Sequence, residues 1–175
     1  NCSPLKARKA GLTHIPEDRN LRGLNRSMSI MDNMIALKVD EKPFAKGIAQ
    51  DKKEIRSFSE KLIERYDVRP SAPENITQAL SGGNAQKIVV AREVEEEGKL
   101  LIAAQPTRGV DIGAIESIRR ILNEVKSRGT GILLVSADLE EVLSLSDRVA
   151  VMYEGKIMAV FSSKEANRDN VGLAM

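Results

Sequence analysis

Residues 80 to 87 read LSGGNAQK, and the interpretation of the rest of the chain depends on this stretch. A serine and two glycines precede a run that we expect to be helical from about Asn84 to Glu96. The first-turn N–H groups of a helix have no intrahelical partner, and the helix dipole adds about half a positive charge there. Glycines allow close approach to the backbone, and Ser81 adds a hydroxyl group. The pattern predicts an anion site, although a plain Ser-Gly-Gly helix start explains these few residues equally well.

Downstream of this helix, short apolar runs alternate with helical periodicity. Residues 100–104 and 131–135 predict two buried strands of the kind found in parallel sheets. Residues 112–126 carry apolar side chains at helical spacing, and residues 148–161 predict a hairpin that turns at Glu154-Gly155. The order β-α-β-α-β-β predicts an α/β fold with a mainly parallel sheet. Shorter helices are expected from Asp138, with Glu141 completing a capping box, and near Ser163.

Upstream of residue 80 the expected elements are a strand and two helices. We expect loops at residues 1–9 and 17–27 and a polar, lysine-rich stretch before residue 50. The strand is expected at residues 11–15, a short helix at 29–37 with Ser29 as its N-cap, and a longer helix at 51–66 before the prolines at 70 and 73.

Composition limits the class of protein. The chain has 42% hydrophobic and 3% aromatic residues, so its core must be mostly aliphatic. The net charge of +2 is too balanced for a nucleic-acid footprint, and no apolar run approaches the roughly 18 residues of a membrane span. Cys2 is the single cysteine, which excludes an internal disulfide and fits a reducing cytoplasm.

LSGGNAQK is followed by LLIAAQPTRGVD at residues 100–111 and by LLVSAD at residues 133–138. In this order the sequence resembles the nucleotide-binding domain of ABC transporters, from Ile15 to the hairpin near residue 155. It looks closest to the C-terminal half of the fused, two-domain ATPases of sugar and nucleoside importers, which share the Pro-Glu-Asp-Arg loop. The resemblance implies a truncated P-loop NTPase core with a mainly parallel sheet, formed by residues 1–25 and 97–175. An α-helical subdomain would be inserted at about residues 26–96.

The resemblance also implies roles for individual residues. Residues 80–84 match the signature loop, and residues 109–111 match the D-loop, which crosses the interface between two domains. Glu17 stands at the place of the Q-loop glutamine, so this loop would pass the nucleotide state to the membrane subunits. Nucleotide contacts are implied for Ser81, Gly82, Gly83, Asn84 (where Gln is usual), Gln86 and Asp111, and coupling contacts for Glu17, Asp18 and Arg19.

Three catalytic positions depart from the family pattern. The strand at residues 100–104 matches Walker B, which normally ends in Asp and is followed by Glu, but these places hold Ala104 and Gln105. Ala104 cannot hold a Mg²⁺ shell, and Gln105 can orient a water molecule but cannot accept its proton. Ala137 stands where a switch histidine normally contacts the γ-phosphate. No G-x-x-x-x-G-K-[ST] occurs and no initiator Met opens the sequence, so we interpret it as a piece of a longer protein that does not hydrolyse ATP alone.

In the family, two domains close head-to-tail around two ATP molecules. The resemblance implies ATP and Mg²⁺ as cofactors of the longer protein, with none bound tightly to residues 1–175 and no metal site of their own. The implied partners are the N-terminal ATPase half of the same protein, transmembrane permease subunits and, indirectly, a periplasmic or lipoprotein solute-binding protein. The implied location is the cytoplasmic face of a bacterial-type plasma membrane. A missing P-loop strand would leave an open sheet edge, so residues 1–175 are also expected to self-associate.

Two other functions stay open. The head fragment of a DNA-maintenance ATPase also has a signature helix, but it would show a long heptad repeat and an intact Asp-Glu after its Walker B strand. A pure interaction module predicts that changing Ser81 leaves ATP turnover unaltered. Other features have plain structural explanations. We expect Met28, Met31 and Met34 in the core, a structural role for His14, a solvated helix end at Glu93, Glu95, Glu96 and Glu97, and a cap with a solvated helix face at Asp138, Glu140 and Glu141.

Overall fold

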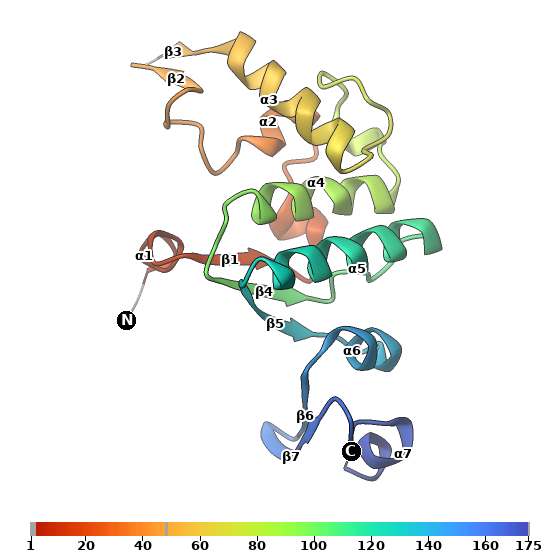
Figure 1. The fold of residues 1–175 in the computed structure, drawn as a ribbon. Helices are drawn as coiled ribbons and strands as arrows, with labels where there is room; N and C mark the ends of the chain where they lie inside the picture. Colours follow the sequence, from red (N-terminus) through yellow and green to blue (C-terminus); the bar gives the residue numbers. More distant parts are fainter. Residues whose placement is uncertain (1–2, 48, 175) are drawn as a thin grey trace. The chain divides into compact units, whose positions relative to one another are not determined.

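A computed structural model describes residues 3–47 and 49–174, which form two compact units divided between Leu133 and Leu134. A three-stranded sheet has the order β1-β4-β5 (Figure 1), and the division between the units falls within β5. Strands β1 (Leu12–Ile15) and β4 (Leu100–Ala104) are parallel, with Leu12 opposite Leu100 and Ile15 opposite Ala103. Strand β5 (Gly131–Val135) is next in the order. The predicted bounds of β4 and β5 are confirmed, and the parallel pairing of β1 with β4 agrees with the predicted mainly parallel sheet.

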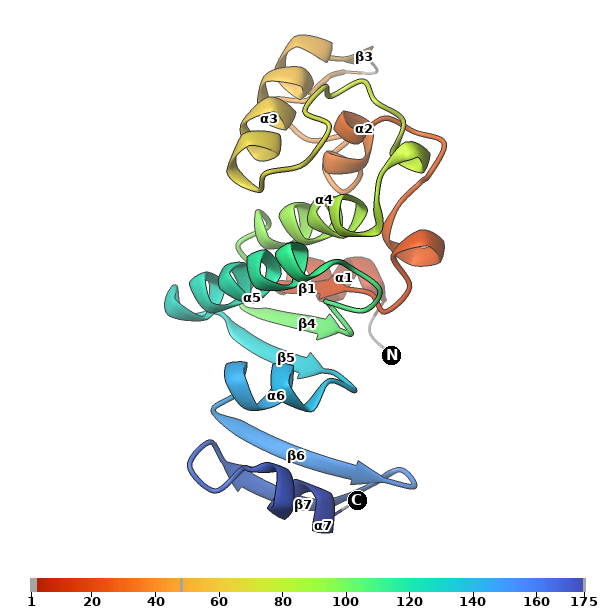
Figure 2. The ribbon, with the colours of Figure 1, turned by 90° about the vertical axis from the view of Figure 1, so that its right-hand side faces the viewer.

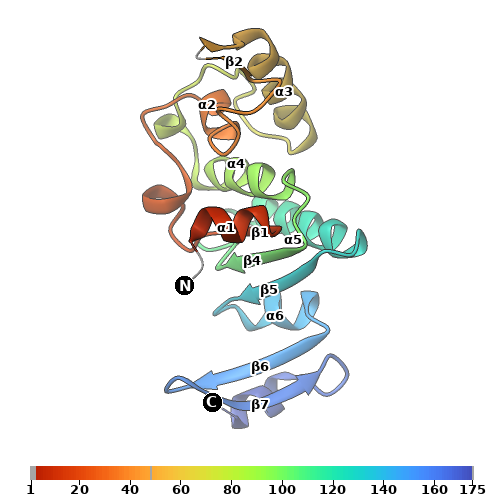
Figure 3. The same cartoon turned by 90° about the vertical axis from the view of Figure 1, so that its left-hand side faces the viewer.

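Two long helices lie side by side on one face of β1 and β4: α4 (Gly82–Val94) and α5 (Ile112–Ser127) (Figures 1 and 2). Helices α2 (Ile30–Met34) and α3 (Lys52–Arg65) lie on the far side of α4 from these strands (Figures 2 and 3). Because α4 is covered from both directions, every residue from Ala85 to Val94 is buried. Helix α5 has an exposed face as well as a buried one. Helix α4 is therefore the centre of the first unit.

Side-chain caps set the starts of these helices. Ser29 caps α2, as the sequence predicted, and forms a reciprocal capping box with Asp32. Asp51, expected as the first residue of the helix, is the N-cap of α3 instead. Helix α4 begins at Gly82 rather than at the predicted Asn84, because Ser81 is its N-cap and accepts a hydrogen bond from the Asn84 N–H. The two glycines therefore belong to the first helical turn.

Several short elements occur before α4 where the sequence predicted loops or no regular element. Helix α1 (Pro4–Lys9) forms because Ser3 caps it and proline occupies its first position. A π-helical turn, Arg19–Gly23, is capped by Asp18 within the expected loop. A small hairpin of β2 (Ala45–Lys46) and β3 (Ala49–Gln50) lies in the lysine-rich stretch, and a 3₁₀ turn covers Thr77–Ala79. All of these elements are too short to show a hydrophobic period.

The buried hydrophobic residues are mainly isoleucine, valine and leucine, which confirms the expected aliphatic core. Met34 is buried, and Met31 packs against the cluster of Ile35, Phe44 and Ile55. The expectation of core packing is wrong for Met28, whose exposed fraction is 43%.

The expectation of a solvated helix end is wrong for Glu93, which is 1% exposed. Its carboxylate accepts two hydrogen bonds from Arg8, at 2.9 and 3.1 Å, and one from the His14 backbone N–H at 3.2 Å. Arg92 lies 3.3 Å from the same carboxylate and also donates to the carbonyl oxygens of Gly23 and Asn33. Burial lowers the pKa of the Arg92 guanidinium, and Glu93 partly opposes that shift. A buried charge is tolerated because several elements supply its partners.

The second unit contains α6 (Leu139–Leu145), the antiparallel strands β6 (Arg148–Tyr153) and β7 (Lys156–Ser162), and α7 (Arg168–Leu173). Glu154 and Gly155 have φ values of 46° and 77°, as a two-residue hairpin turn requires. The predicted hairpin is thus confirmed, whereas the last helix begins at Arg168 rather than near Ser163. Val149, Val151 and Val171 form the core of this unit.

Asp138 caps α6 by accepting hydrogen bonds from the backbone N–H groups of Glu140 and Glu141. The predicted reciprocal capping box is wrong, because neither carboxylate oxygen of Glu141 has a hydrogen-bond partner in the described residues. The expected solvated face is also wrong for Glu141, which is fully buried, while Glu140 is exposed.

Strand β5 is less buried than predicted. The exposed fractions of Leu133 and Val135 are 53% and 51%, so the expectation of a fully buried strand is wrong. Among the described strands β5 stands at the end of its sheet, which is consistent with the predicted open edge, and self-association stays a prediction. The subdomain bounds near residues 26 and 96 also stay a prediction. None of the described helices is long and apolar enough to cross a membrane.

Candidate functional site

The candidate site is the start of α4, where Ser81 is exposed and Gly82 is half-buried. Ser81 Oγ accepts hydrogen bonds from the backbone N–H of Asn84 at 3.4 Å and from its side-chain amide at 3.0 Å. With both acceptor positions of Ser81 Oγ occupied, its proton is available to donate outward. Within the described residues, the backbone N–H groups of Gly82 and Gly83 donate no hydrogen bond, as expected in a first helical turn. This end of α4 therefore offers donors to an external anion.

The structure gives an internal reason for both glycines. A Cβ atom at Gly82 would lie 2.7 Å from Arg19 Nη2 and 2.8 Å from the carbonyl oxygen of Gly109. A Cβ atom at Gly83 would lie 2.5 Å from Asp111 Oδ2 and 2.8 Å from Ala114 Cβ. Such distances are too short for any side chain, so three other segments pack directly against this helical turn. Because Gly83 is buried, an external anion would meet Ser81 and Gly82 first.

Asn84 connects the helix start to the loop that follows α3. Its side-chain oxygen accepts a hydrogen bond from the Arg69 backbone N–H at 2.7 Å, while its amide donates to Ser81 Oγ. Lys87, one turn later, donates to the Asp67 carbonyl oxygen at 2.7 Å. The predicted nucleotide contact of Asn84 stays a prediction, and the observed role of its side chain is to hold Ser81.

Gln86 lies deeper in α4 and is 2% exposed. Its side-chain amide donates to the Pro106 carbonyl oxygen at 2.8 Å. This bond fits a positioning role better than a direct nucleotide contact. Pro106 belongs to the turn after β4. Gln105, the residue before it, has a left-handed φ of 48°, which is uncommon for a residue other than glycine. The turn after β4 is thus held in an unusual backbone conformation next to α4.

The segment predicted as the D-loop lies beside the same helix start. Gly109 has a left-handed φ of 64°, and Asp111 caps α5 by accepting a hydrogen bond from the Ala114 N–H at 2.9 Å. The other carboxylate oxygen of Asp111 faces Gly83. Asp111 and the signature glycines are therefore neighbours, as the predicted shared site requires.

Two of the three predicted coupling residues, Glu17 and Arg19, also contact this segment, and Asp18 caps the turn that carries Arg19. Arg19 donates to the carbonyl oxygens of Arg108, at 2.8 Å, and Gly109, at 3.0 Å. Glu17 forms an ion pair with Arg108, and Asp18 caps the π-helical turn by accepting from the N–H groups of Asn20 and Leu21. The residues predicted for coupling and for the D-loop form one hydrogen-bonded group around a shallow pocket of about 400 Å³.

Ala137 belongs to the second unit, where it is exposed between β5 and the Asp138 cap of α6. Its methyl group offers no proton donor or acceptor. The end of β4 likewise offers no carboxylate, because Ala104 and Gln105 occupy it. Within residues 3–47 and 49–174, no cluster of three or more His, Cys, Asp or Glu side chains could hold a metal ion. A Mg²⁺ ion therefore does not fit the end of this strand.

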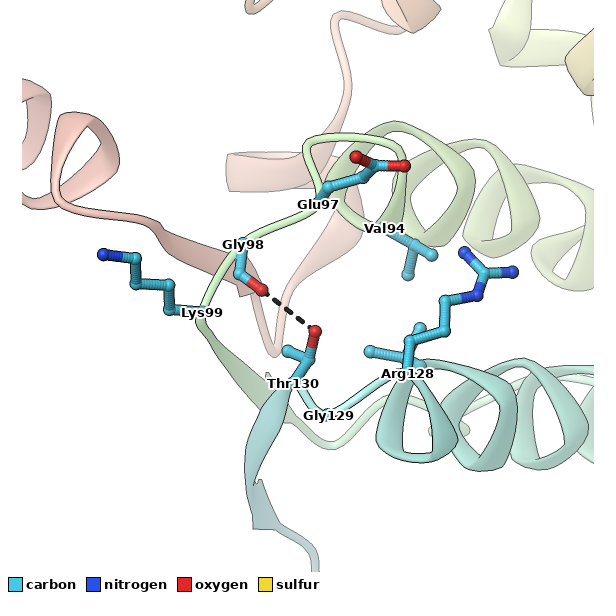
Figure 4. Close-up of a pocket in the computed structure, with 8 residues that line it drawn as sticks. Val94, Glu97, Gly98, Lys99, Arg128, Gly129 and Thr130 are labelled. Atoms are coloured by element: carbon cyan, nitrogen blue, oxygen red, sulfur yellow. Dashed lines mark hydrogen bonds between the residues drawn. The ribbon is translucent and has the colours of Figure 1, made fainter.

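Another cavity, of about 410 Å³, lies at the opposite end of β4. Its walls include Gly98, Lys99, Arg128 and Thr130, and Thr130 Oγ1 donates to the Gly98 carbonyl oxygen at 2.9 Å (Figure 4). Its lining residues Gly98 and Lys99 lie at the amino end of β4, whereas Gln105 lies at the carboxyl end. Ligands of open α/β sheets bind at the carboxyl ends of the strands, so the start of α4 is the stronger candidate.

Several residues that shape the site carry no local signal in the sequence. Arg108 was read only as part of a motif, although it joins both Glu17 and Arg19. Asp67 and Arg69 lie between α3 and Pro70, and their backbone groups bond Lys87 and Asn84. No spacing signal connects these positions, because their partners lie 15 to 91 residues away.

The chain is similar along its whole length to several import ATP-binding proteins. It is 42% identical over 179 residues to the glucose import ATP-binding protein TsgD13 of Haloferax volcanii, covering 100% of this chain and 32% of that protein. It is 41% identical over 175 residues to the guanosine import ATP-binding protein NupO of Bacillus subtilis, covering 100% and 34%. It is 41% identical over 169 residues to the ribose import ATP-binding protein RbsA of Lactococcus lactis, covering 97% and 34%. The chain thus spans about a third of the length of these relatives, and no protein-family model matches it.

Solved structures show the same fold. A nucleotide-free ATP-binding cassette from an ABC transporter superposes with a TM-score of 0.72 at 22% identity, over 93% of this chain and 65% of that one. A dimeric ATP-binding cassette bound to ADP and phosphate superposes with a TM-score of 0.71 at 19% identity, over 91% and 66%. The chain therefore has the fold of an ATP-binding cassette, in the truncated α/β form that its sequence predicted.

Proposed function

We propose that residues 1–175 are the C-terminal cassette of a fused ATP-binding subunit that powers the import of sugars or nucleosides. The observation that carries this proposal is the exposed, capped start of α4 in a chain that matches import ATP-binding proteins along its whole length. The relatives are named for glucose, guanosine and ribose import, which supports a sugar or nucleoside as the cargo.

The proposed chemical role of this cassette is to cap a triphosphate that another domain holds. The Ser81 hydroxyl and the Gly82 N–H donate toward the γ-phosphate, and the positive end of the α4 dipole favours its charge. Interactions of this kind strengthen when a closing interface excludes water, because the effective dielectric constant falls. The N-terminal ATPase half of the same protein supplies the P-loop for this site.

The proposed pair of sites is asymmetric. A site that uses β4 of this chain would have Ala104 and Gln105 in place of carboxylates and Ala137 in place of a histidine, so it lacks a metal ligand and a proton acceptor. The site capped by Ser81 takes these groups from the other half and carries out the chemistry. ATP and Mg²⁺ are cofactors of the complete protein, and residues 1–175 alone neither hydrolyse ATP nor bind it tightly.

The proposed partners are transmembrane permease subunits at the cytoplasmic face of the plasma membrane, with a solute-binding protein acting through them. The exposed turn around Glu17, Asp18 and Arg19 supports this, because it connects the protein surface to the segment beside α4. Nucleotide-dependent movement at the start of α4 would reach the permease through that turn.

The test is Ser81→Arg in the full-length protein, with ATP turnover as the readout. A long cation in place of the cap removes the hydroxyl and blocks the helix start, so we expect turnover to fall about 100-fold. Ser57→Arg, which places the same side chain on an exposed position of α3, is the matched control and should leave turnover unchanged. Unaltered ATP turnover in Ser81→Arg would support an interaction module and overturn the proposed function.

A further inference from the structure

One arginine connects three segments at the start of α4. The two terminal nitrogens of Arg19 donate to the successive carbonyl oxygens of Arg108 and Gly109, at 2.8 and 3.0 Å. The Arg19 side chain comes from the π-helical turn after β1, about 90 residues away in the sequence from both acceptors. A guanidinium group presents its donors in a fixed plane, so this bidentate contact fixes the direction of both carbonyl groups.

The third segment is the first turn of α4. Arg19 Nη2 and the Gly109 carbonyl oxygen lie 2.7 and 2.8 Å from the place where a Gly82 side chain would begin. Both partners of the Arg19–Gly109 hydrogen bond therefore pack directly against the Gly82 backbone. A side chain at position 82 would collide with Arg19 Nη2 and the Gly109 carbonyl oxygen and would disrupt that bond.

We infer that Arg19 is a positioning residue of the proposed nucleotide site, which holds the carbonyl groups of Arg108 and Gly109 against Gly82 and so joins the 17–23 turn to the signature helix. This inference rests on the proposed function, because it assigns a role at the triphosphate cap. Arg19 itself does not contact the nucleotide in this proposal. Movement of the 17–23 turn would have to displace the 108–109 segment, and the reverse also holds.

Neighbouring contacts support this assignment. Glu17 forms a second link to the same segment through its ion pair with Arg108, but both side chains are more than half exposed, so that pair contributes little alone. Arg19 is half-buried, and hydrogen bonds to a charged donor are stronger than neutral ones. Gly109 also requires a left-handed backbone, which Arg19 stabilises through its carbonyl oxygen.

The structural part of the inference can be tested on residues 1–175 by hydrogen–deuterium exchange. Arg19→Ala should speed exchange in residues 106–111 and at the start of α4, while β1 and the middle of α4 keep their protection. Arg19→Lys should give nearly the same increase, because an ammonium group cannot align two carbonyl groups. Arg120→Ala removes a surface arginine that pairs with Glu124 on α5 and serves as the control. Unchanged exchange in residues 106–111 of both Arg19 variants would overturn the inference.

The functional part uses the full-length protein and the KM for ATP. If Arg19 orders the cap, Arg19→Ala should raise KM about tenfold, and Arg19→Lys should not restore it. A residue needed only for folding would lower the amount of active enzyme and leave KM unchanged. A normal KM in Arg19→Ala, in a protein where Ser81→Arg abolishes turnover, would sink the positioning role but leave the proposed function standing. Unaltered turnover in Ser81→Arg would remove the proposed function itself.

Discussion

The side-chain amide of Gln86 donates to the carbonyl oxygen of Pro106 across 2.8 Å, which ties the centre of α4 to the turn after β4. This relationship explains how a turn with a left-handed Gln105 is kept in place, because its next residue is anchored to a buried side chain. The helix that presents Ser81 and the loop that follows β4 are therefore one packed group.

Replacing Gln86 with Leu should lower the free energy of unfolding of residues 1–175 by about 1–3 kcal/mol, because the Pro106 carbonyl oxygen would stay buried without a donor. Urea denaturation measures the change. The exposed Gln78 is the control, and Gln78→Leu should change stability by less than about 0.5 kcal/mol. Equal stability of the two variants would contradict a structural role for the Gln86–Pro106 bond.

The glycine at position 83 should resist substitution for steric reasons. Gly83→Ala places a methyl group 2.5 Å from Asp111 and 2.8 Å from Ala114, so we expect a loss of about 1–3 kcal/mol. Gly113 occupies the same second helical position in α5 but has no atom closer than 3.5 Å to a new Cβ. Gly113→Ala should be neutral or stabilise by up to about 1 kcal/mol. Thermal unfolding of the two variants provides the comparison, and a tolerated Gly83→Ala would show that this turn is not tightly packed.

Glu93→Gln should be strongly destabilising, by about 3 kcal/mol or more, because it leaves Arg92 buried without its counter-charge and weakens the bonds from Arg8. Glu97→Gln, on an exposed residue three positions past the end of α4, is the control and should have little effect. Chemical denaturation of both variants measures the change in their free energy of unfolding. A small loss for Glu93→Gln would mean that the buried ionic group contributes little net stability.

The phenol of Tyr66 should make the folded state sensitive to alkaline pH. Burial raises its pKa above the ordinary value of 10.0, and the hydrogen bond that it donates to Glu95 raises it further. The folded state therefore holds the proton more tightly than the unfolded state, so this contribution is complete below pH 10 and decreases as pH rises further. The loss is at most about 1.4 kcal/mol per pH unit.

Tyr66→Phe isolates that contribution, because it removes the titrating group while keeping the ring. We expect the difference in unfolding free energy between the two proteins to narrow as pH rises above 10. Denaturation at pH 9, 10 and 11 (roughly spanning the ordinary value) provides the measurement. A difference that stays constant over this range would show that the phenol does not ionise differently in the two states.

Elements with a strong local signal could be predicted from the sequence. Helices α3 and α5 and the hairpin of β6 and β7 follow from periodicity and turn residues, and Ser29 marks the start of α2 as its N-cap. The short elements α1, β2 and β3 were missed because two to six residues show no period. The burial of β5 was overestimated because its apolar composition does not reveal which neighbours cover it.

The candidate site was predicted in part. Gly83 and Asp111, which the family resemblance implied as contacts of one nucleotide, lie next to each other because α4 and α5 both begin near the turn after β4; their contact with a nucleotide stays a prediction. The contacts of Arg19 and Glu93 could not be read from spacing, since their partners lie about 80 to 90 residues away and depend on tertiary packing. Glu93 was also misread because a glutamate within an acidic run normally faces water.

Helix α4 has no side that faces water between Ala85 and Val94, and this has a consequence for how the sequence can vary. In a library of all single substitutions, α5 should accept many residues on one face and few on the other. Helix α4 should accept few substitutions at any of these ten consecutive positions, so tolerance should not vary with the usual helical period of three to four residues. Sequence changes that alter the surface of this unit would then have to occur in the segments around α4, while the helix itself stays almost constant.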